Sequence, residues 1–306
     1  MGGERIECIG CFLTANETPG LFHYSVSRRI LEIVVPNRTI PPSAYWWRSI
    51  TGRHIETWWL KTDELLGSLR RLGFSLILFN GADALEQKGV LELLPELKRE
   101  AHVGIATTLL HTTMQEIEMV LCEIDYVIIN IMHPEILGRR DYKRVLKRFF
   151  EALEEKPWVE AHVHVAEDPE WVANLIPETL PRETPVHIIV YNSMLVKKAR
   201  RVVDTLLSYG YCNIYLRLDF VGEEDQTVTR CPGCGRILVV RRGIRASRVD
   251  INGIKCPSCG RRILYVEPLP EWRRVQNRMC GVRVPLSWLV EKSSLGTIGR
   301  RVTGSL

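Results

Sequence analysis

The sequence has no long apolar run and lacks several motifs that identify common classes of enzyme. No stretch approaches the ~20 apolar residues that a membrane-spanning helix needs, and residues 1–8 do not form the apolar segment of a secretory signal. The motifs G-x-x-x-x-G-K-[ST], G-x-G-x-x-G, G-x-S-x-G and H-E-x-x-H are absent. These absences give no support to a P-loop nucleotide site, a dinucleotide fingerprint, a nucleophile elbow or a zinc-protease helix. Because the sequence has neither a membrane-spanning run nor the apolar segment of a secretory signal, we expect a cytoplasmic protein.

The composition is that of a soluble globular protein. Of 306 residues, 45% are hydrophobic and 25% are charged, which allows one large domain with a small appendage, or two domains. The 9 cysteines are an odd number, and four of them lie in two C-x-x-C pairs. In a reducing compartment this pattern indicates metal binding more often than disulfides.

Charge is unevenly distributed along the chain. Residues 230–306 contain 16 basic and 4 acidic residues, a net charge of +12, whereas the remainder contains 25 basic and 32 acidic residues, a net charge of −7. This asymmetry favours an anionic partner, either nucleic acid or an acidic protein. The alternative is that the two parts attract each other, or that arginine keeps the region soluble. The expected patch consists of Arg236, Arg241, Arg242, Arg245, Arg248, Arg261 and Arg262.

The middle of the sequence alternates short apolar runs with segments of helical periodicity. Thr112 or Thr113 with Glu116 resembles a capping box, and Gly73 and Gly210 stand where helices often end. The alternation predicts an α/β fold, a partial (β/α) barrel of about six to seven β/α units. A doubly wound open sheet fits the spacing nearly as well. The expected strands are 30–35, 76–79, 103–106, 126–131, 159–165, 186–190 and 214–218, and the helices 63–72, 85–99, 113–124, 141–154 and 193–209.

Three regions are expected along the chain. The barrel would span 1–225, a zinc ribbon 226–268, and a basic tail 269–306 that we expect to be partly disordered. Within the barrel, Pro36–Trp59 is a long aromatic-rich connection after the first strand. We interpret it as a loop that packs its tryptophans on the body, and a functional loop is the alternative.

The sequence has two near-identical knuckles, C-P-G-C-G at 231–235 and C-P-S-C-G at 256–260, with 21 residues between Cys234 and Cys256. Segments 236–242 and 248–254 look like a hairpin between them, an arrangement typical of zinc ribbons. Four thiolates would close a tetrahedral site, so we predict one structural zinc. A redox pair in each motif and a rubredoxin-like iron site are the alternatives. The four ligands are Cys231, Cys234, Cys256 and Cys259.

A third C-x-x-C, formed by Cys8 and Cys11, has no matching pair nearby. With Cys280 it could form a second metal site, or the two thiols could be a redox pair. The sequence leaves this point open.

Strand alternation places polar residues inside the predicted barrel. The odd-numbered residues of 159–165 are apolar and should face the helices, which turns Glu160, His162 and His164 toward the lumen. Buried polar groups of this kind need partners, and residues at the carboxyl ends of barrel strands commonly form a site. We expect a pocket for a small polar or anionic ligand, and an internal hydrogen-bonded network is the alternative. The candidate residues are Asn80, Asn130, Glu160, His162, His164, His187, Arg217 and Asp219.

The C-terminal half resembles a particular family. Tyr211-Cys-Asn-Ile-Tyr, Cys231-Pro-Gly-Cys-Gly-Arg-Ile-Leu-Val-Val-Arg-Arg-Gly-Ile-Arg and Lys255-Cys-Pro-Ser-Cys-Gly are similar to the end of the AmmeMemoRadiSam-system radical SAM enzymes, relatives of pyruvate formate-lyase activating enzyme. Weaker similarity covers Leu21-Phe22-His23-Tyr24. Phe79-Asn80-Gly81-Ala82-Asp83 lies where the family has Asn-Glu-Pro-Thr. The resemblance implies a radical SAM-like barrel.

The chain departs from this family at its cluster motif. Radical SAM enzymes carry C-x-x-x-C-x-x-C after the first strand, and its thiolates hold a [4Fe–4S] cluster. The corresponding stretch 36–47 contains no cysteine. Without the cluster no electron is supplied for cleaving S-adenosylmethionine, so we expect neither cofactor.

Three hypotheses of function follow. The first is a ligand- or partner-binding protein or pseudoenzyme with a structural zinc ribbon. The second is a nucleic-acid-binding zinc-ribbon protein, whose affinity would fall steeply with salt. The third is a metalloenzyme, or a radical SAM enzyme with an atypical cluster, that involves Cys8, Cys11 or the lumen histidines.

Overall fold

The structure is a computed structural model that describes residues 5–36, 57–81, 83–110, 113–153, 157–218, 227–275 and 283–287. Most of the aromatic connection, Asp219, Cys280 and most of the basic tail, including its expected disorder, lie outside these residues. Within them, no helix has both the length and the apolar composition to cross a bilayer.

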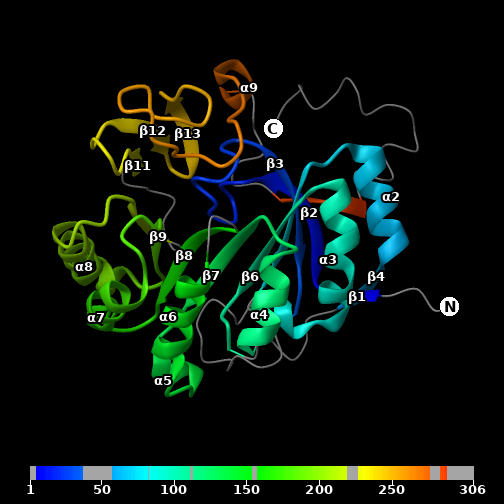
Figure 1. Cartoon of the computed structure of the whole chain (residues 1–306), viewed down its shortest axis with the longest axis horizontal. Helices are drawn as coiled ribbons and strands as arrows, with labels where there is room; N and C mark the ends of the chain where they lie inside the picture. The colour runs from blue at the N-terminus through cyan, green and yellow to red at the C-terminus, as the bar shows by residue number, and fades with distance from the viewer. Residues whose placement is uncertain are drawn as a thin grey trace.

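A sheet of nine strands forms the centre of the molecule (Figure 1). Seven neighbouring strands are parallel, and β2 and β14 pair antiparallel at one edge. In spatial order the strands are β10 (Ile214–Leu218), β9 (Val186–Val190), β8 (Trp158–Val165), β7 (Tyr126–Ile131), β6 (His102–Thr107), β5 (Leu76–Asn80), β3 (Arg29–Val34), β2 (Gly10–Ala15) and β14 (Val284–Pro285). The sheet is therefore open between β10 and β14, and the predicted barrel is not confirmed.

The principal helices pack on one face of this sheet. Their apolar residues share a single buried cluster with the alternate residues of the strands, whereas the cluster on the other face contains only strand and loop residues. A doubly wound sheet would carry helices on both faces, so this alternative does not describe the chain. The helices are α2 (Thr62–Leu72), η2 (Ala84–Glu86), α3 (Lys88–Glu100), α4 (Met114–Leu121), α5 (Pro134–Leu137), α6 (Tyr142–Ala152), α7 (Glu170–Thr179), η3 (Ser193–Leu195), α8 (Val196–Ser208) and α9 (Glu271–Val275).

The strands and several helix ends were predicted correctly from local signals in the sequence. Each of the seven predicted strands corresponds to an observed one. Thr113 forms the expected capping box, because Glu116 N–H donates to Thr113 Oγ1 (3.2 Å) and Thr113 N–H donates to Glu116 Oε2 (2.8 Å). Gly73 ends α2 with a φ of 65°.

The ribbon is a separate three-stranded antiparallel sheet. Its strands are β11 (Thr227–Arg230), β12 (Ile237–Arg242) and β13 (Arg245–Val249). The hairpin was predicted correctly, but its second strand begins three residues earlier than 248 because the chain turns at Gly243, which has a φ of 63°. Figure 1 shows this sheet above β7–β9, with α5–α7 below them. A further pair, β1 (Arg5–Cys8) and β4 (Trp58–Lys61), is antiparallel.

Gly104 on β6 allows a large aromatic ring to lie across the sheet. A Cβ at this position would overlap with the Tyr126 ring, whose hydroxyl donates to Ile77 O (2.5 Å). In contrast, a Cβ at Gly67 within α2 would meet no atom within 4 Å. The two glycines therefore differ in what a side chain would encounter.

We expect Gly104→Ala to lower the free energy of unfolding by about 1–3 kcal/mol, because overpacking a core displaces side chains and backbone. Gly67→Ala should raise it by about 0.5–1 kcal/mol, because alanine is the better helix residue. Urea unfolding of both variants against the unmodified chain measures the difference. Shifts of the same sign would contradict this packing.

Candidate functional site

A row of polar side chains crosses the sheet face that the helices leave uncovered, here called the inner face. Glu160, His162 and His164 lie there, because the alternate residues of β8 pack into the helix-side cluster. His187 on β9 is the register partner of His162, and Tyr215 on β10 is the partner of His187. The predicted alternation of these strands is confirmed.

The carboxylate of Glu160 is fully buried and bonded to groups of the protein itself. It accepts from the backbone N–H groups of residues 22–24, at 2.9, 2.9 and 3.3 Å. It also accepts from Trp158 Nε1 at 3.2 Å, and His187 Nε2 lies 3.0 Å from its second oxygen. A carboxylate offers about four acceptor positions. Glu160 therefore anchors residues 16–28, which we call the β2–β3 loop.

The three inner-face histidines are kept neutral. Burial lowers the pKa values of His162, His164 and His187 well below 6.5, and the guanidinium of Arg217 adds to the effect. His164 is held at both ring nitrogens, by Tyr191 Oη (2.7 Å) and Asn130 Oδ1 (3.0 Å). These rings can donate or accept a hydrogen bond without adding a charge.

The row extends toward β5. Asn130 Nδ2 donates to Gly81 O (3.3 Å), and Asn80 Nδ2 donates to the buried carboxylate of Glu32 (2.7 Å). The guanidinium of Arg283 binds that carboxylate through two nitrogens, at 2.6 and 2.9 Å. The predicted pocket residues of β5 and β7 are thus linked to each other along one edge.

Arg217 lies at the carboxyl end of β10, against the β2–β3 loop. A Cβ at Gly20 would overlap with the Arg217 guanidinium and approach His162 Cε1 to 2.8 Å. Gly20 has a φ of 97°, which also favours glycine. The structure thus gathers seven of the eight candidate residues on the inner face. Asp219 is outside the described residues.

Much of this group forms the internal network that the sequence left as an alternative. Glu160, His162, His164 and His187 each have a hydrogen-bond partner within the protein. Sequence reasoning missed the groups that meet them, because the peptide groups of the β2–β3 loop carry no side-chain signal. The short segment Leu21-Phe22-His23-Tyr24, singled out by its family resemblance, was the available hint.

Arg241 of the ribbon holds the same loop from the opposite side. It is fully buried on β12, donates from Nη2 to Phe22 O (2.6 Å) and from Nη1 to Thr229 Oγ1 (2.7 Å), and lies 4.2 Å from the centre of the Phe22 ring. Thr229 Oγ1 is also 2.7 Å from Tyr215 Oη. The ribbon is therefore bonded to β10 of the large sheet as well as to the loop.

The prediction that Arg241 belongs to a partner-binding patch is wrong, because its guanidinium is inaccessible. Its charge acts inside the protein. Burial raises the pKa of Glu17, and the positive charge of Arg241 opposes that rise. The burial of Arg241 cannot be recognised from composition, since the next residue on the same strand, Arg242, is exposed.

The remaining patch arginines are exposed, but part of their charge is used within the chain. Asp250 lies 2.7 Å from Arg236 and 3.8 Å from Arg248, and Arg261 lies 4.0 Å from Glu183. Arg236 and Arg248 thus pair within the basic region itself, whereas the Arg261–Glu183 pair joins that region to the acidic body, as the alternative of mutual attraction expects. The exposed members are Arg236, Arg242, Arg245, Arg248, Arg261 and Arg262.

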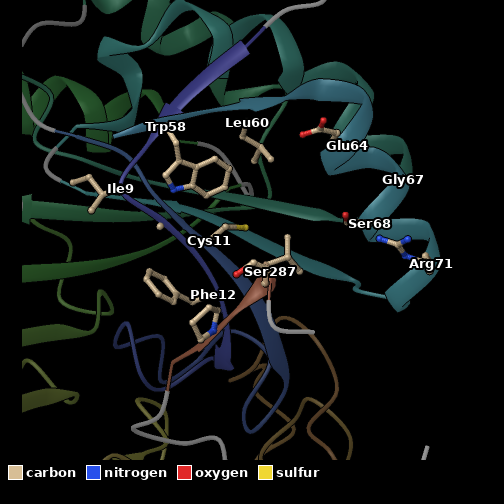
Figure 2. A pocket seen from close by; sticks show the side chains of 13 residues that line it. Ile9, Cys11, Phe12, Trp58, Leu60, Glu64, Gly67, Ser68, Arg71 and Ser287 are labelled. Atoms are coloured by element: carbon tan, nitrogen blue, oxygen red, sulfur yellow. The ribbon is translucent and has the colours of Figure 1, made fainter. Parts of the chain in front are cut away.

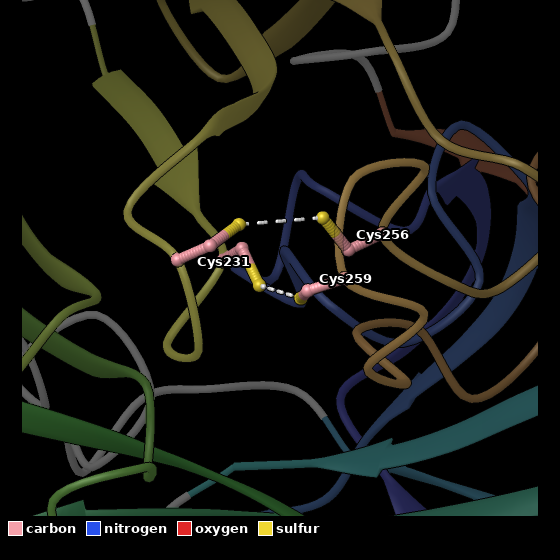
Figure 3. Close-up of side chains that lie close together, drawn as sticks. Cys231, Cys256 and Cys259 are labelled. Atoms are coloured by element: carbon pink, nitrogen blue, oxygen red, sulfur yellow. Dashed lines mark hydrogen bonds between the residues drawn. The ribbon is translucent and has the colours of Figure 1, made fainter.

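The four ribbon cysteines form a group that could bind a metal ion (Figure 3). Their sulfur atoms all lie within 4.8 Å of one another, with Cys231 and Cys259 at 3.4 Å and Cys234 and Cys256 at 3.7 Å. A tetrahedron with metal–sulfur bonds of about 2.3 Å has edges of about 3.8 Å. The residues present therefore fit a tetrahedral thiolate centre.

The two knuckles build this centre in the same way. Gly235 N–H donates to Cys231 O (2.8 Å), and Gly260 N–H donates to Cys256 O (2.9 Å). Both glycines have a φ of 72°, a conformation that other residues rarely adopt. The glycine after each second cysteine thus closes the turn that presents two thiols.

Cys8 and Cys11 are in a different environment. Both are buried in the helix-side cluster, and Cys11 is the register partner of Ile33. Burial raises the pKa of the Cys8 thiol to about 12 and that of Cys11 further. Among the described residues they belong to no group of three potential ligands. Nothing around these two thiols favours the predicted second metal or redox site.

No protein-family model and no curated protein sequence matches this chain. Among solved structures, a domain of pyruvate-formate lyase-activating enzyme from Bacteroides vulgatus aligns with 47% of this chain and 99% of its own, at 13% identity and a TM-score of 0.37. QueE from Escherichia coli aligns with 70% of this chain and 94% of its own, at 10% identity and a TM-score of 0.39. Both are radical SAM enzymes, as the sequence resemblance implied. Such TM-scores are too low for these structures to decide the chemistry of this chain.

We expect Arg241→Ala to lower the free energy of unfolding by about 3 kcal/mol, because Phe22 O loses its donor and buried Glu17 loses a nearby positive charge. Arg242→Ala on the same strand is the matched control and should change it by less than about 0.5 kcal/mol. Urea unfolding measures both. Equal effects would mean that Arg241 does not hold the loop.

The neutral histidines predict a pH effect with a definite sign. Their folded pKa values lie below 6.5, so the unfolded chain binds more protons as pH falls, and their contribution to stability is complete above about pH 6.5 and lost below it. The raised pKa values of Glu17 and Asp83 have the opposite effect on stability, which they increase as pH falls. The histidines are therefore best titrated individually. We expect the NMR signals of His162 and His164 to stay unshifted from about pH 8 to 5, whereas the urea-unfolded chain titrates near 6.5. Titration of either folded ring near 6.5 would contradict their burial.

Proposed function

We propose that this chain is a ligand-binding protein with a radical SAM-like fold that works without a [4Fe–4S] cluster, and that its ribbon holds one structural zinc. The observation that best supports this proposal is the distribution of cysteines along the chain. Four converge on the ribbon with their sulfur atoms within 4.8 Å of one another, and stretch 36–47, where the family places its cluster ligands, has none.

The position of Cys8 and Cys11 supports this proposal. Both thiols lie on the helix side of the sheet, whereas Glu160 and the histidines lie on the inner face. A cluster built on the two thiols would therefore be separated from the inner-face groups by the sheet itself. Their raised pKa values also oppose the thiolate form that binds iron.

Zinc is the metal that best suits the ribbon. Four thiolates in a tetrahedron are typical of structural zinc and leave no open position for a substrate or water. The site would stabilise the ribbon, and through Arg241 and Thr229 it would keep the β2–β3 loop on the inner face. Zinc therefore supplies folding energy here and no step of a reaction.

The proposed ligand site lies at the carboxyl ends of β7–β10. Here Arg217 contributes a positive charge beside His164 and Tyr191, which are hydrogen-bonded to each other and carry none. A small polar or anionic ligand suits one cation surrounded by neutral donors and acceptors. In parallel sheets this edge is also where ligands usually bind.

Metal analysis of protein purified without oxygen tests the proposal. We expect about one zinc per chain and no acid-labile sulfide. Cys234→Ser should lose the zinc, because three thiolates bind it more weakly, and Cys11→Ser should retain it. Cys122→Ser removes an exposed thiol outside the ribbon and is the control for zinc that is lost during purification.

Two results would contradict the proposal. Iron with sulfide that survives in Cys234→Ser but disappears in Cys11→Ser would establish a cluster at the N-terminal pair. Iron without sulfide that depends on Cys234 would replace zinc by a rubredoxin-like centre and leave the ligand-binding part standing. Calorimetry with small carboxylates and phosphates, comparing Arg217→Gln with the unmodified chain, then tests the inner-face site separately.

A further inference from the structure

A pocket of about 830 Å³ opens between α2, β4, β2 and the end of β14 with the residues that follow it (Figure 2). None of its lining residues belongs to the inner-face row or to the four-cysteine group. Its volume falls within the range of small-molecule sites. The pocket is therefore independent of the function proposed above.

The walls of this pocket are mainly apolar. Phe12, Trp58, Leu60 and Leu286 line it, and Trp58 is 42% exposed although it is a large aromatic residue. The thiol of Cys11 also lines it, and burial keeps that thiol protonated by raising its pKa. An exposed indole beside buried aliphatic side chains offers a surface for an apolar molecule.

Helix α2 leaves space over the pocket at Gly67. Glycine is unfavourable in the middle of a helix, yet here it stands on the turn that faces the cavity, and a Cβ would meet no atom within 4 Å. A side chain at this position therefore has room at its Cβ. Gly67 thus provides a way to narrow the pocket while improving the helix.

The rim of the pocket carries one acidic and one basic side chain. Glu64 and Arg71 both line the pocket, but Glu64 is paired with Lys61 at 3.5 Å. Arg71 is exposed and has no ion-pair partner within the described part of the chain. The guanidinium of Arg71 is therefore available to an anionic group whose apolar part enters the cavity.

We propose that this pocket binds a small amphipathic organic anion, with its apolar body against Trp58 and Phe12 and its anionic group at Arg71. A molecule of this class matches both features of the site, since the walls are mainly apolar and Arg71 at the rim has no ion-pair partner within the described part of the chain. A purely polar anion would leave the walls exposed, and a neutral apolar molecule would not use Arg71.

Isothermal titration calorimetry with decanoate and with 1-decanol, both below the concentrations at which they aggregate, tests the proposal. We expect Arg71→Gln to weaken decanoate binding about fivefold, the effect of losing one exposed ion pair, and to leave 1-decanol binding unchanged. Arg148→Gln removes an exposed arginine from α6, which does not line the pocket, and should change neither.

Gly67→Leu narrows the cavity and provides the second arm. We expect it to weaken binding of both probes while the thermal midpoint stays the same or rises, because leucine is a better helix residue than glycine. Unchanged affinity of Gly67→Leu for decanoate would place the site elsewhere and overturn the proposal. So would absence of decanoate binding to the unmodified chain, or equal losses in Arg71→Gln and Arg148→Gln.

Discussion

The buried carboxylate of Glu160 and the three consecutive N–H groups that it accepts from residues 22–24 are the contact on which the inner face depends. A charged carboxylate inside a protein requires several donors to offset its lost hydration. Here the donors come from the backbone of the β2–β3 loop, so the charge fixes the path of that loop. Arg241 then binds the outward carbonyl of Phe22, which places one loop between a carboxylate of the sheet and a guanidinium of the ribbon.

This arrangement joins the four-cysteine group to the large sheet through hydrogen bonds of the ribbon, since none of the four cysteines comes from that sheet. The four cysteines hold the two knuckles of the ribbon, and β12 between them carries Arg241 into the interior. Thr229 on β11 makes the second connection through Tyr215. The ribbon is therefore more than a small appendage, because the β2–β3 loop on the inner face is bonded to it.

The two faces of the sheet have separate chemical characters. The helix side is apolar and contains Cys8 and Cys11 as protonated core residues. The inner face carries the polar row, where buried rings are neutral and Arg217 supplies positive charge. The pocket beside β2 and α2 is a third environment, in which apolar walls meet the exposed side chain of Arg71. A ligand bound on the inner face cannot contact the groups of the helix side, since the sheet lies between them.

Local order was available from the sequence alone. Apolar periodicity located the seven parallel strands and the helices between them, and a capping box and glycine turns marked several ends, because these signals act between residues close in the chain. The paired C-x-x-C motifs identified the four cysteines, and alternation put Glu160 and the histidines on one face. Only the tertiary structure decided that Arg241 is buried while Arg242 is exposed, that Cys8 and Cys11 lie on the side away from the histidines, and that a loop more than a hundred residues distant in sequence satisfies Glu160. Those outcomes depend on which surfaces pack against each other in the folded chain. Such long-range contacts set burial, protonation and hydrogen-bond partners, and they produce no periodic pattern in the sequence.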